Sequence, residues 1–412
     1  MPPLRPLWAN PTLALMLVLG FSSGLPLALT SGTLQAWLAT GNLATETVSL
    51  FTLVGLPYTL KFLWAPFMDR YALPLGRRRG WMVVTQLLLV VVILAMATTD
   101  PSQQAPTLAL LALAVALLSA SQDVAIDAYR AETLRPSERG LGSAVSVVGY
   151  RLAMLASGAG ALIIAQFYGF STAYSLMALL LLVGPLAAWL GSEPPIPVTA
   201  PRTLRGAVWE PLAEFFNRPN AWALLAIIVC YKLGDAFAGS LSTLFLIRGM
   251  GFSVGEVGAV NKGLGLLAAL AGGLVGGTLM ARLGLYRSLL TFGVLQGISN
   301  LAFAALAAAG KSYPLMLTAV GLENLAGGMG TAAFVALLMS LCDSRYTATQ
   351  FALLSALAAL GRVYVGPVSG VLVETWGWTL FFVLTVVAAL PGLGLLIWFR
   401  QRIESLDFGA HS

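Results

Sequence analysis

The hydrophobic positions of this chain fall into a series of long apolar segments, which short polar segments separate. A helix needs about 20 apolar residues to cross the hydrocarbon core of a membrane, and the apolar segments are roughly of that length. They predict twelve membrane-spanning helices, at residues 12–38, 47–67, 81–99, 106–130, 140–166, 170–190, 220–246, 254–280, 288–309, 313–340, 347–372 and 377–399. The chain is therefore expected to be an all-α integral membrane protein.

The longest polar break, residues 191–219, divides the predicted helices into two sets of six. Four prolines lie near its start, and proline-rich segments form semi-rigid linkers. We expect an N-terminal six-helix bundle, a cytoplasmic linker, a C-terminal six-helix bundle and a cytoplasmic tail, at residues 1–191, 192–219, 220–399 and 400–412.

The composition supports a membrane protein without catalytic chemistry. Hydrophobic residues make up 58% of the chain and charged residues 10%, whereas soluble domains have about 45–50% and about 25%. The single histidine, His411, lies in the C-terminal tail, and Cys230 and Cys342 fall in or near apolar segments. We therefore expect no metal site, no cofactor and no enzymatic active site.

The net charge of +6 is explained by the orientation of the predicted helices. With the N-terminus in the cytoplasm, the cytoplasmic segments hold fifteen arginines, whereas the opposite side holds only Arg248 and Lys311. Positive residues are enriched in the cytoplasmic loops of membrane proteins. Both termini are therefore expected in the cytoplasm, and the positive charge does not indicate a nucleic-acid partner.

Several charged residues lie inside the predicted membrane-spanning segments. They are Lys61, Asp123, Asp127, Arg130, Arg151, Lys232, Asp235, Lys262, Glu323 and Arg362. A charge inside a bilayer is costly, so such residues usually face a cavity, a partner or a transported solute. Six of the ten are positive, and this surplus favours an anionic solute.

Asp123 and Asp127 are the strongest candidates for a proton site. Their spacing of four places both carboxylates on one face of a helix, where they repel each other and are partly desolvated. One of them can then carry a proton near neutral pH, which proton coupling requires. The alternative is that they form structural ion pairs with Arg130 or Arg151.

In the second half, Glu323 lies close to the expected membrane midplane and has no obvious partner within its helix. It is a candidate proton or ligand site, and an ion pair with Lys232 or Arg362 is the alternative. Lys232 and Asp235 are three residues apart and can pair on one helical face.

Candidate ligand contacts combine these charges with amide and aromatic groups. Lys61 and Arg151 can bind an anionic ligand, or they compensate the charges of the two aspartates. Gln35 can hydrogen-bond sugar hydroxyls, and Trp37 can stack on a sugar ring, although its depth favours an interfacial position. The full set is Gln35, Lys61, Gln122, Tyr150, Arg151, Lys232, Asp235 and Asn324.

Two loops resemble the loop signature of the major facilitator superfamily, G-x-L-x-D-R-x-G-R-R. The first copy is FMDRY at residues 67–71 followed by GRRR at 76–79, and in the second copy Ala281 replaces the aspartate. The resemblance implies the major facilitator fold of two six-helix bundles, with substrate bound near the midplane. Asp69 and Arg70 would then act in gating, and the alternative is an ordinary loop cap beside arginines that set the topology.

Longer stretches of the first half closely resemble the AmpG family of bacterial muropeptide permeases. They are residues 19–37 (LGFSSGLPLALTSGTLQAW), 61–71, 119–123 and 146–152. The resemblance implies proton-coupled import of N-acetylglucosaminyl-1,6-anhydro-N-acetylmuramyl muropeptides, with or without a stem peptide, across the bacterial inner membrane for cell-wall recycling. In some organisms this flux controls β-lactamase induction. The implied partners are the muropeptide, protons and the lipid bilayer, and a monomer is expected.

Two other functions are compatible with the same fold. One is a carrier of another anionic solute, such as an acyl-coenzyme A, and the other is a membrane assembly factor that transports nothing. An assembly factor has no need of Asp123, Asp127, Lys232 and Glu323 together, so the polar residues within the membrane favour a carrier.

Overall fold

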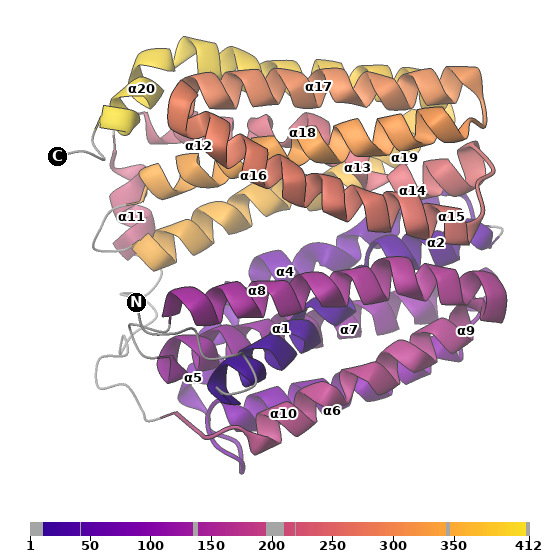
Figure 1. Ribbon diagram of the computed structural model, residues 1–412, viewed down its shortest axis with the longest axis vertical. Coiled ribbons are helices and arrows are strands. Elements are labelled where there is room, and N and C mark those ends of the chain that lie inside the picture. Colours follow the sequence, from indigo (N-terminus) through magenta and orange to yellow (C-terminus); the bar gives the residue numbers. More distant parts are fainter. Residues whose placement is uncertain are drawn as a thin grey trace, which may run out of the picture. The chain divides into compact units, whose positions relative to one another are not determined.

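The computed structural model describes residues 11–41, 43–134, 139–194, 210–218, 220–342 and 347–408. Apart from an isolated bridge between Leu73 and Gly76, every regular element among them is helical (Figure 1). The elements of the first half are α1 (Pro11–Leu29), α2 (Gly32–Thr40), α3 (Thr45–Leu50), η2 (Phe51–Gly55), α4 (Leu56–Leu60), η3 (Lys61–Leu63), α5 (Ala65–Arg70), α6 (Arg79–Ala97), α7 (Pro101–Thr133), α8 (Arg139–Leu155), η4 (Ala156–Gly160), α9 (Ala161–Leu181) and α10 (Val183–Leu190).

The second half is also built from helices. Its elements are α11 (Glu210–Phe216), α12 (Ala221–Tyr231), α13 (Leu233–Ser240), α14 (Ser242–Leu244), η6 (Phe245–Gly249), α15 (Val254–Val257), η7 (Gly258–Leu264), α16 (Gly265–Leu283), α17 (Leu285–Ala309), α18 (Tyr313–Ser340), α19 (Thr347–Trp398) and α20 (Arg400–Phe408). The prediction of an all-α protein is confirmed for the residues that the structure describes.

Nine helical stretches in the described part of the chain are long and apolar enough to cross a membrane. Two of them, Val145–Leu190 and Leu353–Trp398, have 46 residues each, about twice the length that one crossing requires. Gly169 and Gly377 interrupt these stretches with φ angles of 82° and 74°. Glycine adopts this left-handed conformation at little cost, so each stretch is two helices joined by a turn, as the predicted boundaries require.

The predicted span at 47–67 is not a single continuous helix. It consists of α3, η2, α4, η3 and α5, each of three to six residues. Pro57 and Pro66 lie in the first turns of α4 and α5, where proline's missing N–H is tolerated but a preceding helix is interrupted. The count of twelve membrane-spanning helices therefore stays a prediction.

The chain forms two compact units. Unit 1 contains the described residues of 1–43, 54–200 and 253–259, and unit 2 contains those of 44–53, 201–252 and 260–412. Each unit thus takes in one short segment from the other half of the sequence. In unit 1 the Gly255 N–H donates to Gln166 Oε1 at 3.1 Å, and in unit 2 the Glu46 N–H donates to Glu374 Oε1 at 3.3 Å.

In unit 1, α1 and α8 pack with their backbones almost in contact (Figure 1). A Cβ atom added to Gly20 would lie 2.1 Å from the Ser146 carbonyl oxygen, and one added to Gly149 would lie 2.1 Å from the carbonyl oxygen of Leu17. Only glycine leaves room for this approach. The contact places the polar residues of α1 beside those of α8.

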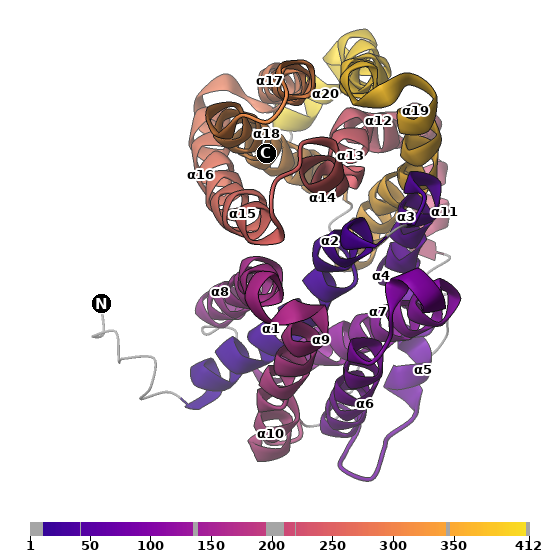
Figure 2. The ribbon, with the colours of Figure 1, turned by 90° about the vertical axis from the view of Figure 1, so that its right-hand side faces the viewer.

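Unit 2 has the same kind of close glycine contact between α16 and α18, which lie side by side in Figures 1 and 2. Added Cβ atoms would come within 2.1 Å of the Leu325 carbonyl oxygen at Gly272 and within 2.7 Å of the Met329 Cα at Gly276. This close contact positions the polar face of α18 next to η7 and α16.

Candidate functional site

The first polar cluster, in unit 1, centres on Asp123 of α7. The Ser23 hydroxyl of α1 donates a hydrogen bond to Asp123 Oδ1 at 2.5 Å. Among the residues that the structure describes, no cation lies within ion-pair distance of Asp123. The structural ion pair with Arg130 or Arg151 is therefore not found for this carboxylate, which keeps a partner that can remain in place in either protonation state.

Asp127, one turn further along α7, has the opposite environment. Its carboxylate pairs with Arg130 at 2.9 Å and with Lys61 at 3.9 Å, and its side chain is 53% exposed. The alternative of charge compensation, which the sequence left open for Lys61 and Arg130, is what the structure shows here. The two aspartates are therefore not equivalent. Asp127 has cations within 4 Å, whereas Asp123 accepts from a hydroxyl and has Lys61 only as a more distant electrostatic neighbour.

Gln122 and Tyr150 lie next to this cluster but differ in how their polar groups are used. The buried Gln122 amide donates to the Ser22 carbonyl oxygen at 2.8 Å, so it ties α7 to α1. Tyr150 of α8 is half-buried, packs against Gly24 and is an electrostatic neighbour of Asp123. Tyr150 is thus the better placed of the two for a ligand contact.

The remaining ligand-contact candidates of this unit are Arg151, Gln35 and Trp37. Arg151 is exposed and its guanidinium contacts Met154 Sδ at 3.8 Å, with no ion pair to any described residue. Gln35 is half-buried on α2. Trp37 is only 7% exposed and stacks on Phe170, with ring centroids 5.6 Å apart. Its ring therefore packs within unit 1 and is not free to stack on a sugar in this arrangement, while the expected interfacial depth stays a prediction.

The second polar cluster, in unit 2, begins with Lys232. Its ammonium group donates to Asp235 Oδ2 and to Thr331 Oγ1, both at 3.1 Å. The predicted pairing of Lys232 and Asp235 is confirmed. The Lys232 side chain is 9% exposed and that of Asp235 is 24% exposed, so the carboxylate is the more accessible member of the pair.

Glu323 and Asn324 of α18 form the other part of this cluster. Asn324 Nδ2 donates to Glu323 Oε2 at 2.7 Å and to the Val320 carbonyl oxygen at 2.9 Å. Lys262 of η7 and Lys232 are electrostatic neighbours of Glu323. No described cation lies within 4 Å of this carboxylate, so the ion pair with Lys232 is not found, and the Arg362 side chain lies outside the described residues.

The predicted gating pair is Asp69 and Arg70. Asp69 and Arg70 are the last two residues of α5, and their side chains lie outside the described part of the structure. Their role in gating stays a prediction.

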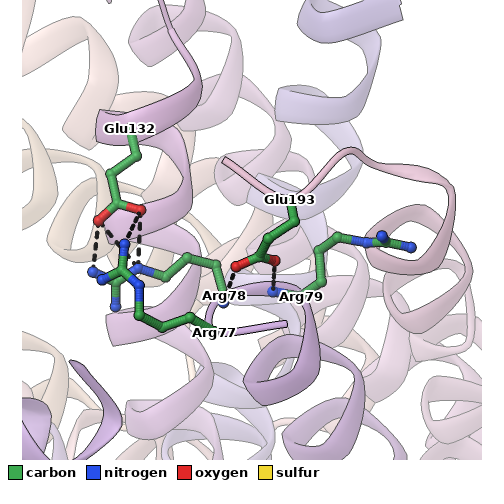
Figure 3. Close-up of polar contacts among 5 residues, drawn as sticks. All are labelled: Arg77, Arg78, Arg79, Glu132 and Glu193. Atoms are coloured by element: carbon green, nitrogen blue, oxygen red, sulfur yellow. Dashed lines mark hydrogen bonds and ion pairs between the residues drawn. The ribbon is translucent and has the colours of Figure 1, made fainter. Parts of the chain in front are cut away.

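The loop that follows α5 contains an ion-pair network that the sequence did not indicate (Figure 3). Glu132 of α7 accepts hydrogen bonds from Arg77 at 2.9 Å and from Arg78 at 2.7 Å. Glu193, which follows α10, accepts from the backbone N–H groups of Arg78 and Arg79 at 2.8 and 3.0 Å. The arginines were interpreted only as topology signals. In the structure they also connect this loop to the end of α7, through Glu132, and to the segment after α10, through Glu193.

Comparison with known proteins identifies relatives over most of the chain. The profile of the Major Facilitator Superfamily matches residues 12–309. The Anhydromuropeptide permease of Escherichia coli (strain K12) is 54% identical over 400 residues, which are 97% of this chain and 82% of the permease. A putative transporter AmpG 4 of Rickettsia felis is 32% identical, with 94% of this chain and 96% of the relative covered.

Solved structures support the same fold at lower identity. A bacterial homologue of the human lysosomal transporter Spinster has a TM-score of 0.73 and 17% identity, covering 98% of this chain and 99% of its own. A D-xylose-proton symporter has a TM-score of 0.73 and 12% identity, covering 93% of this chain and 96% of its own.

Proposed function

This chain belongs to the major facilitator superfamily and, within it, to the family of the anhydromuropeptide permeases, and on that premise we propose that it carries anhydromuropeptides across a membrane together with protons. It is a multi-pass membrane transporter and not an enzyme. The proposed cargo is N-acetylglucosaminyl-1,6-anhydro-N-acetylmuramic acid, with or without its stem peptide, for cell-wall recycling.

The observation that carries the proposal of proton coupling is the environment of Asp123. A carboxylate that is not held in an ion pair can take up and release a proton without breaking one. The Ser23 hydroxyl, 2.5 Å away, can donate to the ionised form and accept from the protonated form. Asp127 is held by two cations, which makes it the less suitable proton carrier.

The residues proposed to contact the cargo lie in both units. Lys61 pairs with Asp127 and Lys232 pairs with Asp235, and a carboxylate of the cargo can exchange with the acid that each now binds. Tyr150 and Asn324 add groups that hydrogen-bond to sugar hydroxyls. Glu323 is a second candidate proton carrier, because its hydrogen-bond partner is also neutral.

We further propose that the protein lies in the bacterial inner membrane as a monomer, with both termini in the cytoplasm, and that transport runs from the periplasm to the cytoplasm. The excess of arginines on the expected cytoplasmic side supports this orientation.

Uptake by proteoliposomes tests the proposal. Purified protein is reconstituted, and accumulation of radiolabelled anhydro-disaccharide is measured with an inward proton gradient, without one, and with a protonophore. We expect accumulation only with the gradient. Uptake that ignores the gradient would remove the proton coupling. Uptake of an acyl-coenzyme A in place of the disaccharide would indicate another cargo, and no uptake of either would favour an assembly factor.

A further inference from the structure

A cavity of about 800 Å³ lies in unit 2 where α16 turns into α17, and the polar clusters described above do not use it. The turn contributes Arg282, Gly284 and Arg287, while Ser340 of α18 and Glu404 of α20 close the other side. The cavity therefore lies at one end of a membrane-spanning helix pair, where membrane lipid headgroups are found.

The charge of this cavity is positive. Arg282 and Arg287 are both exposed, and neither guanidinium has a hydrogen bond or ion pair with a residue in the described part of the chain. The one acidic group of the lining, Glu404, already accepts from Arg400 at 2.9 Å. Two guanidinium groups without carboxylate partners around one cavity are suited to a phosphate group, whose oxygens they can bind in a bidentate manner.

An apolar surface leads away from the cavity along α16. Leu283 belongs to the cavity lining, and Leu279 and Val275 follow at intervals of four residues, so all three lie along one face of the helix. Their exposed fractions are 37%, 36% and 44%. A ligand with a phosphate at one end and an acyl chain at the other matches this arrangement, in which an apolar helix face extends from a cationic cavity.

We propose that this cavity binds the headgroup of an anionic phospholipid, of the phosphatidylglycerol class, with one acyl chain along the exposed face of α16. Basic pockets between helices at the membrane interface are a recurring type of lipid site. The glycerol hydroxyls of the headgroup can donate to Glu404, whereas the ammonium group of phosphatidylethanolamine would approach two arginines.

Native mass spectrometry of the full chain in detergent micelles tests the proposal. The protein is titrated with dioleoyl-phosphatidylglycerol, dioleoyl-phosphatidylethanolamine or inorganic phosphate, and the fraction carrying one bound molecule is measured. We expect the apparent Kd for phosphatidylglycerol to rise roughly five-fold in Arg282→Gln or Arg287→Gln and roughly thirty-fold in the double variant.

Arg402→Gln is the matched control, because it removes the same charge from an exposed position of α20 outside this cavity. Its Kd for phosphatidylglycerol should change less than two-fold. An equal loss in Arg402→Gln would mean diffuse attraction by surface charge and overturn the site. Equal binding of phosphatidylethanolamine, or displacement of the lipid by millimolar inorganic phosphate, would overturn the assignment to an anionic lipid. Thermal unfolding of each variant confirms that the exposed substitutions leave the fold intact.

Discussion

Ser23 Oγ lies 2.5 Å from Asp123 Oδ1, although the two residues are 100 positions apart in the chain. The serine belongs to α1 and the aspartate to α7, and the two helices pack within unit 1. Ser23 is the direct hydrogen-bond partner of the carboxylate that we propose to carry the proton, so its substitution provides the first test of the mechanism.

Ser23→Ala should slow proton-driven uptake by roughly ten-fold or more, because a hydrogen bond to a charged group contributes about 1.5–3 kcal/mol. Initial rates in proteoliposomes measure the effect. Ser31→Ala is the control, since the Ser31 hydroxyl, in the turn between α1 and α2, donates to the nearby Leu27 carbonyl oxygen and not to a carboxylate. If both variants transport at the wild-type rate, the Ser23 contact has no part in coupling.

Asp123→Asn should abolish accumulation driven by a proton gradient, because an amide cannot take up and release the proton. Asp127→Asn, which removes a carboxylate paired with Lys61 and Arg130, should retain part of it. Counterflow exchange of labelled disaccharide shows whether binding survives in each variant. Accumulation by Asp123→Asn at the wild-type level would make Asp123 a structural residue.

Variants of the Lys232–Asp235 pair distinguish a structural role of Lys232 from a ligand-binding role. Lys232→Ala leaves a partly buried carboxylate without its cation and should lower the stability by about 3–5 kcal/mol, whereas the double variant with Asp235→Ala should recover much of that loss. Thermal unfolding and disaccharide-peptide binding are measured on all variants. Recovered stability with lost binding would assign Lys232 to the ligand, and recovery of both would make the pair structural.

Arg78→Ala should destabilise unit 1 by about 3–5 kcal/mol, because it leaves Glu132 without its main partner in a site where the arginine is 5% exposed. Arg78→Lys should not restore the stability, since an ammonium group cannot bind the carboxylate in a bidentate manner. Unfolding in detergent followed by tryptophan fluorescence measures the loss. A lysine variant as stable as the wild type would show that charge alone holds this loop.

Gly272→Ala and Gly273→Ala form a matched pair on α16. The Cβ added at position 272 would lie 2.1 Å from the Leu325 carbonyl oxygen, whereas the one at 273 would meet nothing within 4 Å. Overpacking a tight helix contact costs about 1–3 kcal/mol or more, so the first variant should unfold at a lower temperature and the second should match the wild type. Equal midpoints would contradict the close contact of α16 and α18.

The pairing of Lys232 with Asp235 and of Arg130 with Asp127 could be predicted because residues three apart lie on one helical face. The length of one membrane crossing placed the breaks near Gly169 and Gly377, where the apolar runs exceed that length. The membrane class followed from composition, since no soluble core accounts for 58% hydrophobic residues. Each of these conclusions depends either on a few residues that are close in the sequence or on the average composition of the whole chain.

Contacts between helices could not be obtained in this way. The bonds from Ser23 to Asp123, from Arg78 to Glu132 and from Lys232 to Thr331 join residues 54 to 100 positions apart. Which side chains meet there depends on the rotation and axial register of packed helices, and hydrophobic periodicity sets neither within a membrane, where lipid also accepts an apolar face. The sequence by itself therefore determined the class, the approximate places of the long apolar helices and the candidate charges. The tertiary structure decided which acid forms an ion pair and which accepts a hydrogen bond from a hydroxyl.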